Sequence, residues 1–436
     1  MTIEDDLSRL GHAPVMVVLK PQVMRRWHGR AMLSLEETKD VQQEVAHKLR
    51  QHFRTFRNSR LSLSAKLTPA LEGDADGPLE KVDQRVQAAV GDTNSVRYYP
   101  NLGLMYGTVD KAGWAALSLE DDVAEVAVPP QLSLIQPAED AALAGPEEGM
   151  SWALRRLRID ELWSKGLTGD GVLIGHSDTG VDATHPALTD KVDAFAYFDA
   201  SGRQVAGARP ADTGFHGTHT AGILVGGPVD GVTFGVAPGA KLVSASVIED
   251  GDVPSRVFGS LNWLVAQGVR LVSLSLGVRG FAPQLATVMQ ILRQRDMLPI
   301  VAIGNEGVQT SRTPGNLPEA LSVGAMNQND ELWDRSSSQQ IVEPPKRTVP
   351  TLIGPGAGIW SCVPNAQMRS LSGTSMAAPH IAGLAALLLQ RRPDITIMNL
   401  ERAIVGSCTR PVGISTSRGN KGVPDAVKAL ALLEQK

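Results

Sequence analysis

A run of small residues leading into a long apolar segment near the end of the chain restricts the fold more than any other feature. Residues 372–380 read Ser-Gly-Thr-Ser-Met-Ala-Ala-Pro-His, and residues 381–389 read Ile-Ala-Gly-Leu-Ala-Ala-Leu-Leu-Leu. This pattern predicts a tight loop that becomes the first turn of a buried helix. Pro379 is tolerated there because an N–H at a helix start has no intrahelical partner.

Ser375 then lies at a helix N-terminus, where unpaired N–H groups and the helix dipole can receive negative charge. Serine and threonine are also ordinary helix caps. Other segments must therefore decide whether Ser375 is a cap or a nucleophile.

Composition narrows the class of protein. The chain has 436 residues, of which 42% are hydrophobic and 20% charged, and its formal net charge is −4. This charge gives no reason to expect nucleic acid or an anionic membrane as a partner. The two cysteines, Cys362 and Cys408, are too few for a disulfide framework, and either one bridge or two free thiols is open. No Cys-x-x-Cys pair is present, and no metal or other cofactor is expected.

The amino-terminal residues bear on localisation. Residues 1–8 are acidic and polar, whereas an export signal starts with basic residues and continues with an apolar run. No stretch reaches the roughly 18 apolar residues that span a bilayer. We therefore expect a cytoplasmic protein, or a secreted one if a signal has been removed.

The chain divides into three regions of different character. Residues 1–135 alternate short strands with amphipathic helices, which predicts a small α+β domain. Residues 136–150 are rich in Ala, Pro, Gly and acidic residues and read as a linker. From residue 151 to 436, apolar strands alternate with helices, which predicts a mostly parallel sheet covered on both faces, a three-layer α/β/α fold.

Individual elements follow from apolar periodicity. In the first domain we expect strands at 14–19 and 123–128, one or two strands at 96–109, and helices at 35–56, 79–90 and 111–118. In the second we expect strands at 171–178, 240–248, 269–276, 298–303 and 320–323, and helices at 217–225, 255–266, 283–295, 374–390, 398–405 and 424–433.

Four segments carry polar side chains that a buried core does not require. Asp178 and Asn305 each follow an apolar strand, His216 begins a helix of small residues, and Ser375 is the fourth. A serine nucleophile needs an imidazole to accept its proton, and the imidazole needs a carboxylate to fix its tautomer. The oxyanion needs donors, which an Asn side chain and a backbone N–H supply. Asp182 competes with Asp178 for the role of the acid but lies in a turn.

The sequence around these residues resembles the subtilisin-like serine proteases, the subtilases. The matching segments cover the chain from about residue 152 onward: Asp178-Thr-Gly, His216-Gly-Thr-His-Thr-Ala-Gly, Gly235-Val-Ala-Pro-Gly-Ala, Ser273-Leu-Ser-Leu-Gly, Gly304-Asn-Glu-Gly and Gly373-Thr-Ser-Met-Ala-Ala-Pro-His. The order Asp, His, Asn, Ser is that of subtilisin itself, so it is matched and not independently predicted.

The resemblance implies a serine endopeptidase with a role for each of the four residues. Asp178 matches the orienting acid and His216 the general base. Asn305 matches the oxyanion donor and Ser375 the nucleophile.

The resemblance also implies a substrate-binding edge at Ser275, Leu276 and Gly277, which would pair with an extended peptide through main-chain hydrogen bonds. Side-chain preference must then come from pockets, and Glu306 and Arg312 are expected near the main one. These two residues either select charge in the substrate, pair with each other or face solvent.

Residues 1–135 stand where subtilases carry a propeptide, which in the family acts as a folding chaperone and inhibitor. Residues 132–135, Leu-Ser-Leu-Ile, are expected in the active-site groove, and self-cleavage is predicted between residues 134 and 150. The resemblance thus implies a self-processing proenzyme whose partners are protein or peptide substrates and its own N-terminal domain. The alternative is a subtilase scaffold that the uncleaved domain holds shut, and that acts as a binding or signalling module until a partner releases it.

A calcium site that is common in secreted subtilases is not expected here. Ala187 stands where the family has a carboxylate, and Val229 lies in the loop where it has Asn. His219, one turn from His216, lacks a third ligand at zinc spacing, so it is expected to be structural, as are His176, His185 and His380.

Overall fold

The computed structural model describes residues 2–20, 35–54, 96–139, 149–199, 201–248, 252–342 and 345–435, with only the backbone described in residues 35–42. The predicted helix at 79–90 lies outside the described residues. The chain forms two compact units. Unit 1 consists of Met1–Pro130 with the short segments Phe198–Gln204 and Glu249–Trp263, and unit 2 consists of Gln131–Tyr197, Val205–Ile248 and Leu264–Lys436.

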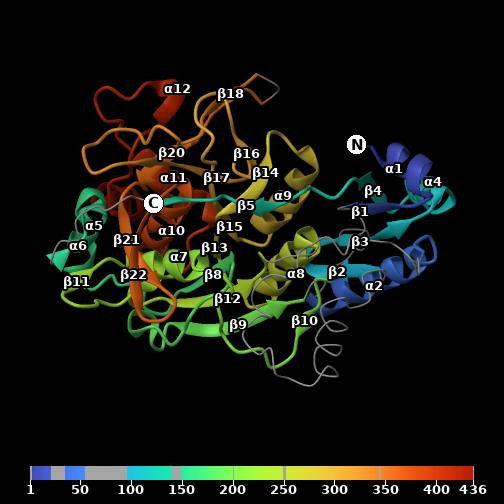
Figure 1. Ribbon diagram of the computed structural model, residues 1–436, viewed down its shortest axis with the longest axis horizontal. Coiled ribbons are helices and arrows are strands. Elements are labelled where there is room, and N and C mark those ends of the chain that lie inside the picture. Colours follow the sequence, from blue (N-terminus) through green and yellow to red (C-terminus); the bar gives the residue numbers. More distant parts are fainter. Residues whose placement is uncertain are drawn as a thin grey trace, which may run out of the picture. The chain divides into compact units, whose positions relative to one another are not determined.

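Unit 1 is built on a four-stranded sheet in the order β2-β3-β1-β4, with antiparallel pairing throughout (Figure 1). The strands are β1 (Ala13–Leu19), β2 (Arg97–Tyr99), β3 (Leu104–Val109) and β4 (Val123–Ala127), and the helices are α1 (Ile3–Leu10), α2 (Leu35–Arg50) and α4 (Lys111–Leu119). Helix α2 ends six residues before its predicted end. Helix α1, which was not predicted, begins with a capping box in which Thr2 and Asp5 bond each other's backbone N–H groups.

Within unit 1, the sheet is hydrogen-bonded to the start of α8 (Val253–Ala266). The Tyr99 hydroxyl donates to the carbonyl oxygen of Ser255 over 3.0 Å, and the Asn101 N–H donates to the side-chain oxygen of Asn262 over 2.9 Å. The short segment Glu249–Trp263 therefore belongs to the compact unit formed by the first 130 residues.

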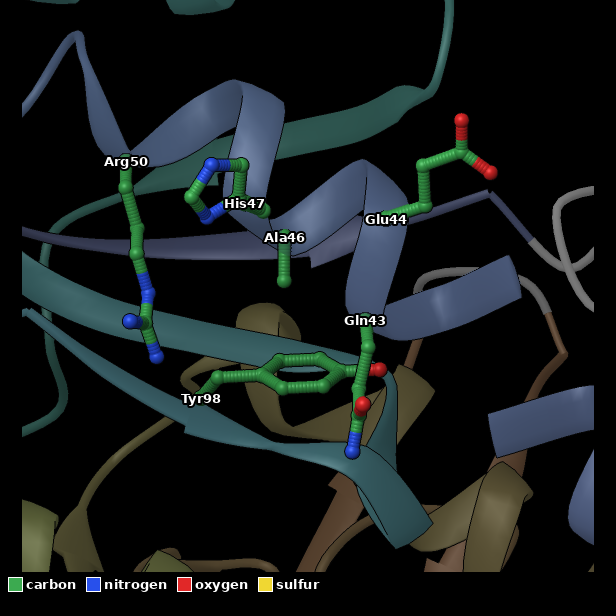
Figure 2. A pocket seen from close by; sticks show the side chains of 6 residues that line it. All are labelled: Gln43, Glu44, Ala46, His47, Arg50 and Tyr98. Carbon is green, nitrogen blue, oxygen red and sulfur yellow. The ribbon is translucent and has the colours of Figure 1, made fainter. Parts of the chain in front are cut away.

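A hollow of about 520 Å³ lies between α2 and β2 in unit 1. Figure 2 shows Gln43, Ala46 and Arg50 projecting from α2 toward Tyr98. The hollow contains none of the residues that the sequence marks for chemistry.

Unit 2 is organised around a sheet in the order β10-β9-β12-β8-β13-β15-β17-β20, in which every pairing from β9 to β20 is parallel. The strands are β8 (Leu173–Asp178), β9 (Val192–Phe198), β10 (Gln204–Val205), β12 (Lys241–Ser246), β13 (Leu271–Leu274), β15 (Leu298–Ala302), β17 (Leu321–Met326) and β20 (Leu352–Pro355). The predicted mostly parallel α/β/α architecture is confirmed. The predicted strand at 269–276 is two strands, because the chain leaves the sheet at Ser275 and continues as β14 (Leu276–Arg279).

Helices and small ladders complete unit 2 (Figure 1). The helices are α5 (Trp152–Leu157), α6 (Ile159–Trp163), α7 (His216–Val225), α9 (Ala286–Gln294), α10 (Thr374–Arg391), α11 (Ile397–Gly406), α12 (Thr416–Gly419) and α13 (Ala426–Glu434). The short strands are β5 (Ser133–Leu134), β6 (Ala138–Glu139), β7 (Gly149–Met150), β11 (Val232–Thr233), β16 (Arg312–Thr313), β18 (Gln339–Ile341), β19 (Arg347–Val349), β21 (Ile359–Val363) and β22 (Gln367–Ser372). In the described part of the chain, no helix has the length and apolar character that crossing a membrane requires.

Helix α10 is the centre of unit 2. It packs against β13, β15, β17 and β20 and against α7, and every residue from Thr374 to Leu389 is buried. Pro379 lies six residues into this helix, beyond the first turn that the sequence suggested. Its missing N–H leaves the carbonyl oxygen of Ser375 without an intrahelical donor. The Ser275 hydroxyl donates to that oxygen over 3.3 Å, so a side chain from the end of β13 replaces the donor that Pro379 lacks.

Candidate active site

Asp178 and His216 meet at the carboxyl end of β8. Asp178 is the last residue of that strand, His216 is the first residue of α7, and both side chains are buried. The His216 Nδ1 lies 2.7 Å from Asp178 Oδ1, which also accepts the Thr179 N–H over 2.7 Å. Burial by itself raises the pKa of Asp178, but the His216 imidazole and these hydrogen bonds outweigh it and hold the pKa below its usual value. The carboxylate is therefore ionised and fixes the imidazole with its proton on Nδ1.

Asp212, which the sequence analysis missed, joins the two elements that carry this pair. Its Oδ1 accepts the Thr179 hydroxyl over 2.7 Å, and its Oδ2 accepts both the N–H and the hydroxyl of Thr218 over 2.7 and 2.6 Å. The approach of α7 to the residues after β8 is so close that a Cβ on Gly217 would lie 2.1 Å from the Gly180 carbonyl oxygen. The sequence signal that could have identified Asp212 was an acidic residue four positions before His216, close to the start of a predicted helix.

Asn305 follows β15 and lies beside the first residues of α10. Its Oδ1 accepts both the N–H and the hydroxyl of Thr374 over 2.9 Å. Because the amide oxygen is occupied in this way, the Nδ2 group must point in the other direction, and it donates to the carbonyl oxygen of Gln136 over 2.8 Å. The side chain is thus held as a donor toward a peptide carbonyl.

Ser375, the second residue of α10, donates its hydroxyl to the carbonyl oxygen of Ile135 over 3.0 Å. Its hydroxyl and the Asn305 amide therefore contact the two neighbouring carbonyl groups of Ile135 and Gln136. The Nε2 atom of His216 is buried and has no hydrogen-bond partner among the described residues. In this structure the Ser375 hydroxyl is thus bonded to the chain's own backbone and not to His216.

Residues 132–139, which we call the active-site strap, bring those carbonyl groups into the site. On one side, β5 of the strap pairs antiparallel with β14, so that Leu134 lies opposite Leu276 and Ser133 opposite Gly277. The Ile135 N–H extends this ladder by donating to the Ser275 carbonyl oxygen over 2.9 Å. From the sequence we expect residues 132–135 beside the edge at 275–277, and Ser133 and Leu134 pair with that edge in the structure.

The strap continues past Ser375 to the other side of the site. There β6 pairs antiparallel with β22, with Ala138 opposite Ser372 and Glu139 opposite Leu371. The Glu139 carboxylate also accepts a hydrogen bond from Arg369 over 3.1 Å. The sequence analysis did not foresee this second pairing, so the chain passes through the site and is held on both sides.

The edge at Ser275, Leu276 and Gly277 is shaped for main-chain pairing. Gly277 lies so close to β16 that an added Cβ would come within 2.6 Å of the Thr313 carbonyl oxygen. Strand β14 therefore pairs with β16 on one edge and with the strap on the other. An extended chain is the natural occupant of that second edge.

Glu306 and Arg312 pair with each other, one of the three arrangements that the sequence left open. The Glu306 Oε1 accepts from Arg312 Nη2 over 2.5 Å and from Nε over 2.9 Å, while Arg312 Nη1 reaches the Ser133 hydroxyl over 3.1 Å. Burial by itself raises the pKa of Glu306, but Arg312 outweighs it, so the pKa is lowered. The Nε atom of Arg279 lies 3.5 Å from the same carboxylate.

The competing sequence candidates occupy other places. Asp182 accepts hydrogen bonds from Thr184 in its own turn and from the N–H of Asn365 in the turn between β21 and β22. His219 faces two carbonyl oxygens through Nε2, and burial lowers its pKa to about 3. His380 lies beside its helix carbonyl at Met376, and burial lowers its pKa to about 4. These histidines are therefore uncharged at neutral pH.

The two cysteines are free thiols, and burial raises the pKa of each to about 12. A thiol with so high a pKa is a poor nucleophile and a poor metal ligand at neutral pH. The described residues contain no cluster of three or more His, Cys, Asp or Glu side chains arranged to hold a metal ion.

Removal of calcium is expected to leave the melting temperature unchanged. Neither Ala187, which is buried, nor Val229 has a side-chain oxygen to offer a hard cation, and their carbonyl oxygens already accept the N–H groups of Gly227 and Val232. The check is a thermal melt with added calcium and with excess chelator. A bound ion would raise the melting temperature with its concentration, so a chelator-induced drop that calcium restores would contradict this expectation.

Comparison with known proteins agrees with the geometry. A model described as the subtilase family matches residues 169–427, more than half of the chain. A subtilisin-like protease of Myxococcus xanthus, PopC, is 33% identical over 341 residues, which cover 69% of this chain and 69% of PopC. M-protease of Shouchella clausii is 30% identical over 294 residues (66% and 72%), and subtilisin BL of Lederbergia lenta is 30% identical over 266 residues (60% and 92%). This chain therefore belongs to the subtilase family and is a subtilisin-like serine endopeptidase.

Proposed function

We propose that peptide bonds are hydrolysed by Ser375, with His216 as general base and Asp178 as the acid that orients it. The observation that carries the proposal is the buried contact of 2.7 Å between Asp178 Oδ1 and His216 Nδ1, which leaves Nε2 unpartnered in the same site. A buried nitrogen without a partner is costly unless a reacting group comes to occupy it. The Ser375 hydroxyl becomes that partner once the strap carbonyl no longer accepts it.

The steps then follow from the side chains. The Ser375 Oγ attacks the scissile carbonyl carbon while His216 Nε2 takes the hydroxyl proton, and Asp178 stabilises the resulting imidazolium. The oxyanion is held by Asn305 Nδ2, which Thr374 already orients, and by the Ser375 N–H in the first turn of α10. The imidazolium returns its proton to the leaving amine, and water then hydrolyses the acyl-enzyme by the same steps in reverse.

Extended polypeptide is the proposed substrate. The edge at Ser275, Leu276 and Gly277 offers main-chain donors and acceptors, and these recognise a chain of almost any sequence provided it is unfolded. The strap supports this proposal, because it is itself an extended segment paired there.

We further propose that the chain is a self-processing proenzyme, with residues 1–135 as the inhibitory domain, 136–150 as the processing linker and 151–436 as the peptidase domain. Support comes from the strap, whose carbonyl groups at Ile135 and Gln136 contact Ser375 and Asn305. The second candidate function, a scaffold held shut until a partner releases it, is favoured by the pairing of the same strap on both sides of Ser375.

A fluorophosphonate probe separates these two functions. Such a probe forms a covalent bond only with a serine that a neighbouring base activates. Wild-type protein produced as the full-length chain is expected to cut its own strap and then to be labelled at Ser375 without any added protease, whereas the Ser375→Ala protein is not labelled. Labelling that appears only after the strap is displaced, for example by mild proteolysis of the linker, would support the scaffold. The absence of label under both conditions would contradict the proposed triad.

The Glu306–Arg312 pair leads to a prediction about side-chain preference. As an ion pair it is neutral overall, so the wild-type enzyme is expected to distinguish charge only weakly at the substrate position that Ser133 occupies. In Arg312→Gln, the Glu306 carboxylate keeps its hydrogen bonds from the Asn305 N–H and the Ser337 hydroxyl, and Arg279 at 3.5 Å is its remaining cationic partner among the described residues. Peptides with Lys at that position are then expected to gain about tenfold in kcat/KM over peptides with Ser, since a gain of about 1.4 kcal/mol is tenfold.

Three peptides that differ only at that position, with Ser, Lys or Glu, measure this preference. Arg279→Gln is the control, because its side chain is mostly exposed and an exposed pair contributes little. A strong charge preference in the wild-type enzyme, or an unchanged Lys-to-Ser ratio in Arg312→Gln, would show that the pair does not govern the choice.

A further inference from the structure

A second buried histidine lies behind the catalytic carboxylate. His176 stands two residues before Asp178 in β8, so the two side chains lie on the same face of the strand. Its Nδ1 lies 2.9 Å from the Ser244 hydroxyl and its Nε2 lies 2.9 Å from the Thr220 hydroxyl. The Thr220 hydroxyl in turn lies 3.4 Å from Asp178 Oδ2, and all four side chains are buried.

The side chains of Ser244, His176, Thr220 and Asp178 form a hydrogen-bond network, and the hydrogen bonds of Asp178 determine which atom donates each proton in it. Its Oδ1 already accepts from His216 and Thr179, whereas among the described residues only the Thr220 hydroxyl lies within hydrogen-bonding distance of its Oδ2, and His176 Nε2 lies 4.0 Å from that oxygen. A buried, ionised carboxylate oxygen without a donor is strongly unfavourable. The single proton of the Thr220 hydroxyl is therefore required at Oδ2.

That proton has competing acceptors. The Thr220 oxygen also lies 3.2 Å from the His216 carbonyl oxygen and 3.1 Å from that of Gly217, the usual partners of a threonine within a helix. The Nε2 atom of His176 would be a further acceptor if it carried no hydrogen. If Nε2 does carry the hydrogen, it donates to the Thr220 oxygen over 2.9 Å and fixes the rotation of that hydroxyl, so that its proton points at the carboxylate. Without this bond the hydroxyl is free to turn to the two carbonyl oxygens, which are nearer than Asp178 Oδ2.

We propose that His176 is a positioning residue of the catalytic site, whose Nε2–H tautomer holds the Thr220 proton on Asp178 Oδ2 and thereby limits the negative charge that Asp178 presents to His216. The Ser244 hydroxyl then donates to His176 Nδ1, so that each hydrogen bond of the network from Ser244 to Asp178 contains one proton. Burial lowers the pKa of His176, in keeping with an uncharged ring at neutral pH. This inference rests on the proposed roles of Asp178 and His216.

The direction of the effect follows from charge. Without the Thr220 donor, the carboxylate keeps more negative charge and stabilises the His216 imidazolium more strongly, so His216 stays protonated to higher pH. The acid limb of the kcat/KM profile is then expected to move upward by about half a unit to one unit. In the part of the chain that the structure describes, four titratable groups surround His216 and its partners: Asp178 and His176 from β8, His219 within α7, and Asp212 before α7, whose charge acts on His176. Three of them are unchanged when His176 is replaced.

The experiment compares pH profiles of the active enzyme. His176→Leu and Thr220→Val are each expected to shift the acid limb upward. The double variant is expected to shift it no further, because both substitutions remove the same hydrogen bond to Asp178 Oδ2. His176→Gln keeps an amide donor and is expected to restore most of the wild-type profile. His185→Leu is the matched control, since it removes another buried imidazole that contacts Gln367 and Ala187 instead.

A measurement without activity covers the case in which a variant folds poorly or the enzyme proves inactive. Nitrogen-15 chemical shifts of His176 in the Ser375→Ala protein are expected to show a protonated Nε2 and an unprotonated Nδ1. An Nδ1–H tautomer, an additive shift in the double variant, or an equal shift in His185→Leu would each overturn the proposal. Failure of the catalytic assignment itself would instead appear as an active Ser375→Ala enzyme.

Discussion

Replacing Ser375 by alanine is expected to lower kcat for an extended peptide about a millionfold, the size established for subtilisin itself, with KM changed only a few-fold. The alanine keeps the backbone N–H of α10 and the pairing edge at β14, so substrate still binds, but no oxygen remains to attack the carbonyl. Turnover of a fluorogenic peptide measures the loss, after the linker of both proteins has been cut by an added protease that is then removed, because Ser375→Ala is not expected to process itself. Ser361→Ala is the matched control, because that buried hydroxyl donates to the His219 carbonyl oxygen and takes no part in the proposed chemistry.

Asn305→Ala tests the other half of the same site. Loss of one oxyanion donor is expected to cost about 10²–10³ in kcat, again the subtilisin magnitude. Because Asn305 also accepts two hydrogen bonds from Thr374, Thr374→Val is needed beside it to separate a displaced amide from a missing one. A Ser375→Ala enzyme with appreciable turnover, or an Asn305→Ala loss that Thr374→Val reproduces in full, would contradict the assigned roles.

The sequence predicted the elements whose pattern is strong and local. Helix α10 and strands β8, β12, β15 and β17 are long apolar runs, so periodicity identifies each as a helix or a strand. The carboxyl ends of β8 and β15 then place Asp178 and Asn305 at one edge of a parallel sheet. Strand β20 was missed because four residues carry no period. Strand β9 was missed because its half-buried residues alternate imperfectly.

What the sequence could not predict depends on distant partners. The residues Gln136, Pro137 and Ala138 have no alternating apolar pattern. Strand β6 forms only because it pairs with the edge of β22. Asp212 looks like a solvent-facing loop acid until its partners Thr179 and Thr218 are brought together. Ser375 was correctly placed at a helix start, but its actual partner is set by the register of β5 on β14, which no motif encodes.

Self-cleavage is the second large effect expected. Intact-mass spectrometry of purified wild-type protein is expected to find fragments separated between residues 134 and 150, whereas Ser375→Ala stays a single chain. The strap supplies the reason, because its Ile135 and Gln136 carbonyl groups contact Ser375 and Asn305 before any substrate arrives. A segment already bound in the site needs no encounter step, so its effective concentration exceeds that of any free peptide.

The order of the reaction distinguishes cleavage within one molecule from cleavage by a second molecule, and the fragment ends identify the bond that is cut. Cleavage of a strap by its own active site is first order and keeps the same half-life on dilution, whereas cleavage by a second molecule slows. Asn305 donates to Gln136, while the ladder with β14 ends at Ile135, so the Ile135–Gln136 and Gln136–Pro137 bonds are the two that contact the proposed machinery. If wild type and Ser375→Ala both remain intact, the strap is an inhibitory segment that the enzyme does not cleave. Activity then requires another protein to displace or cut the strap.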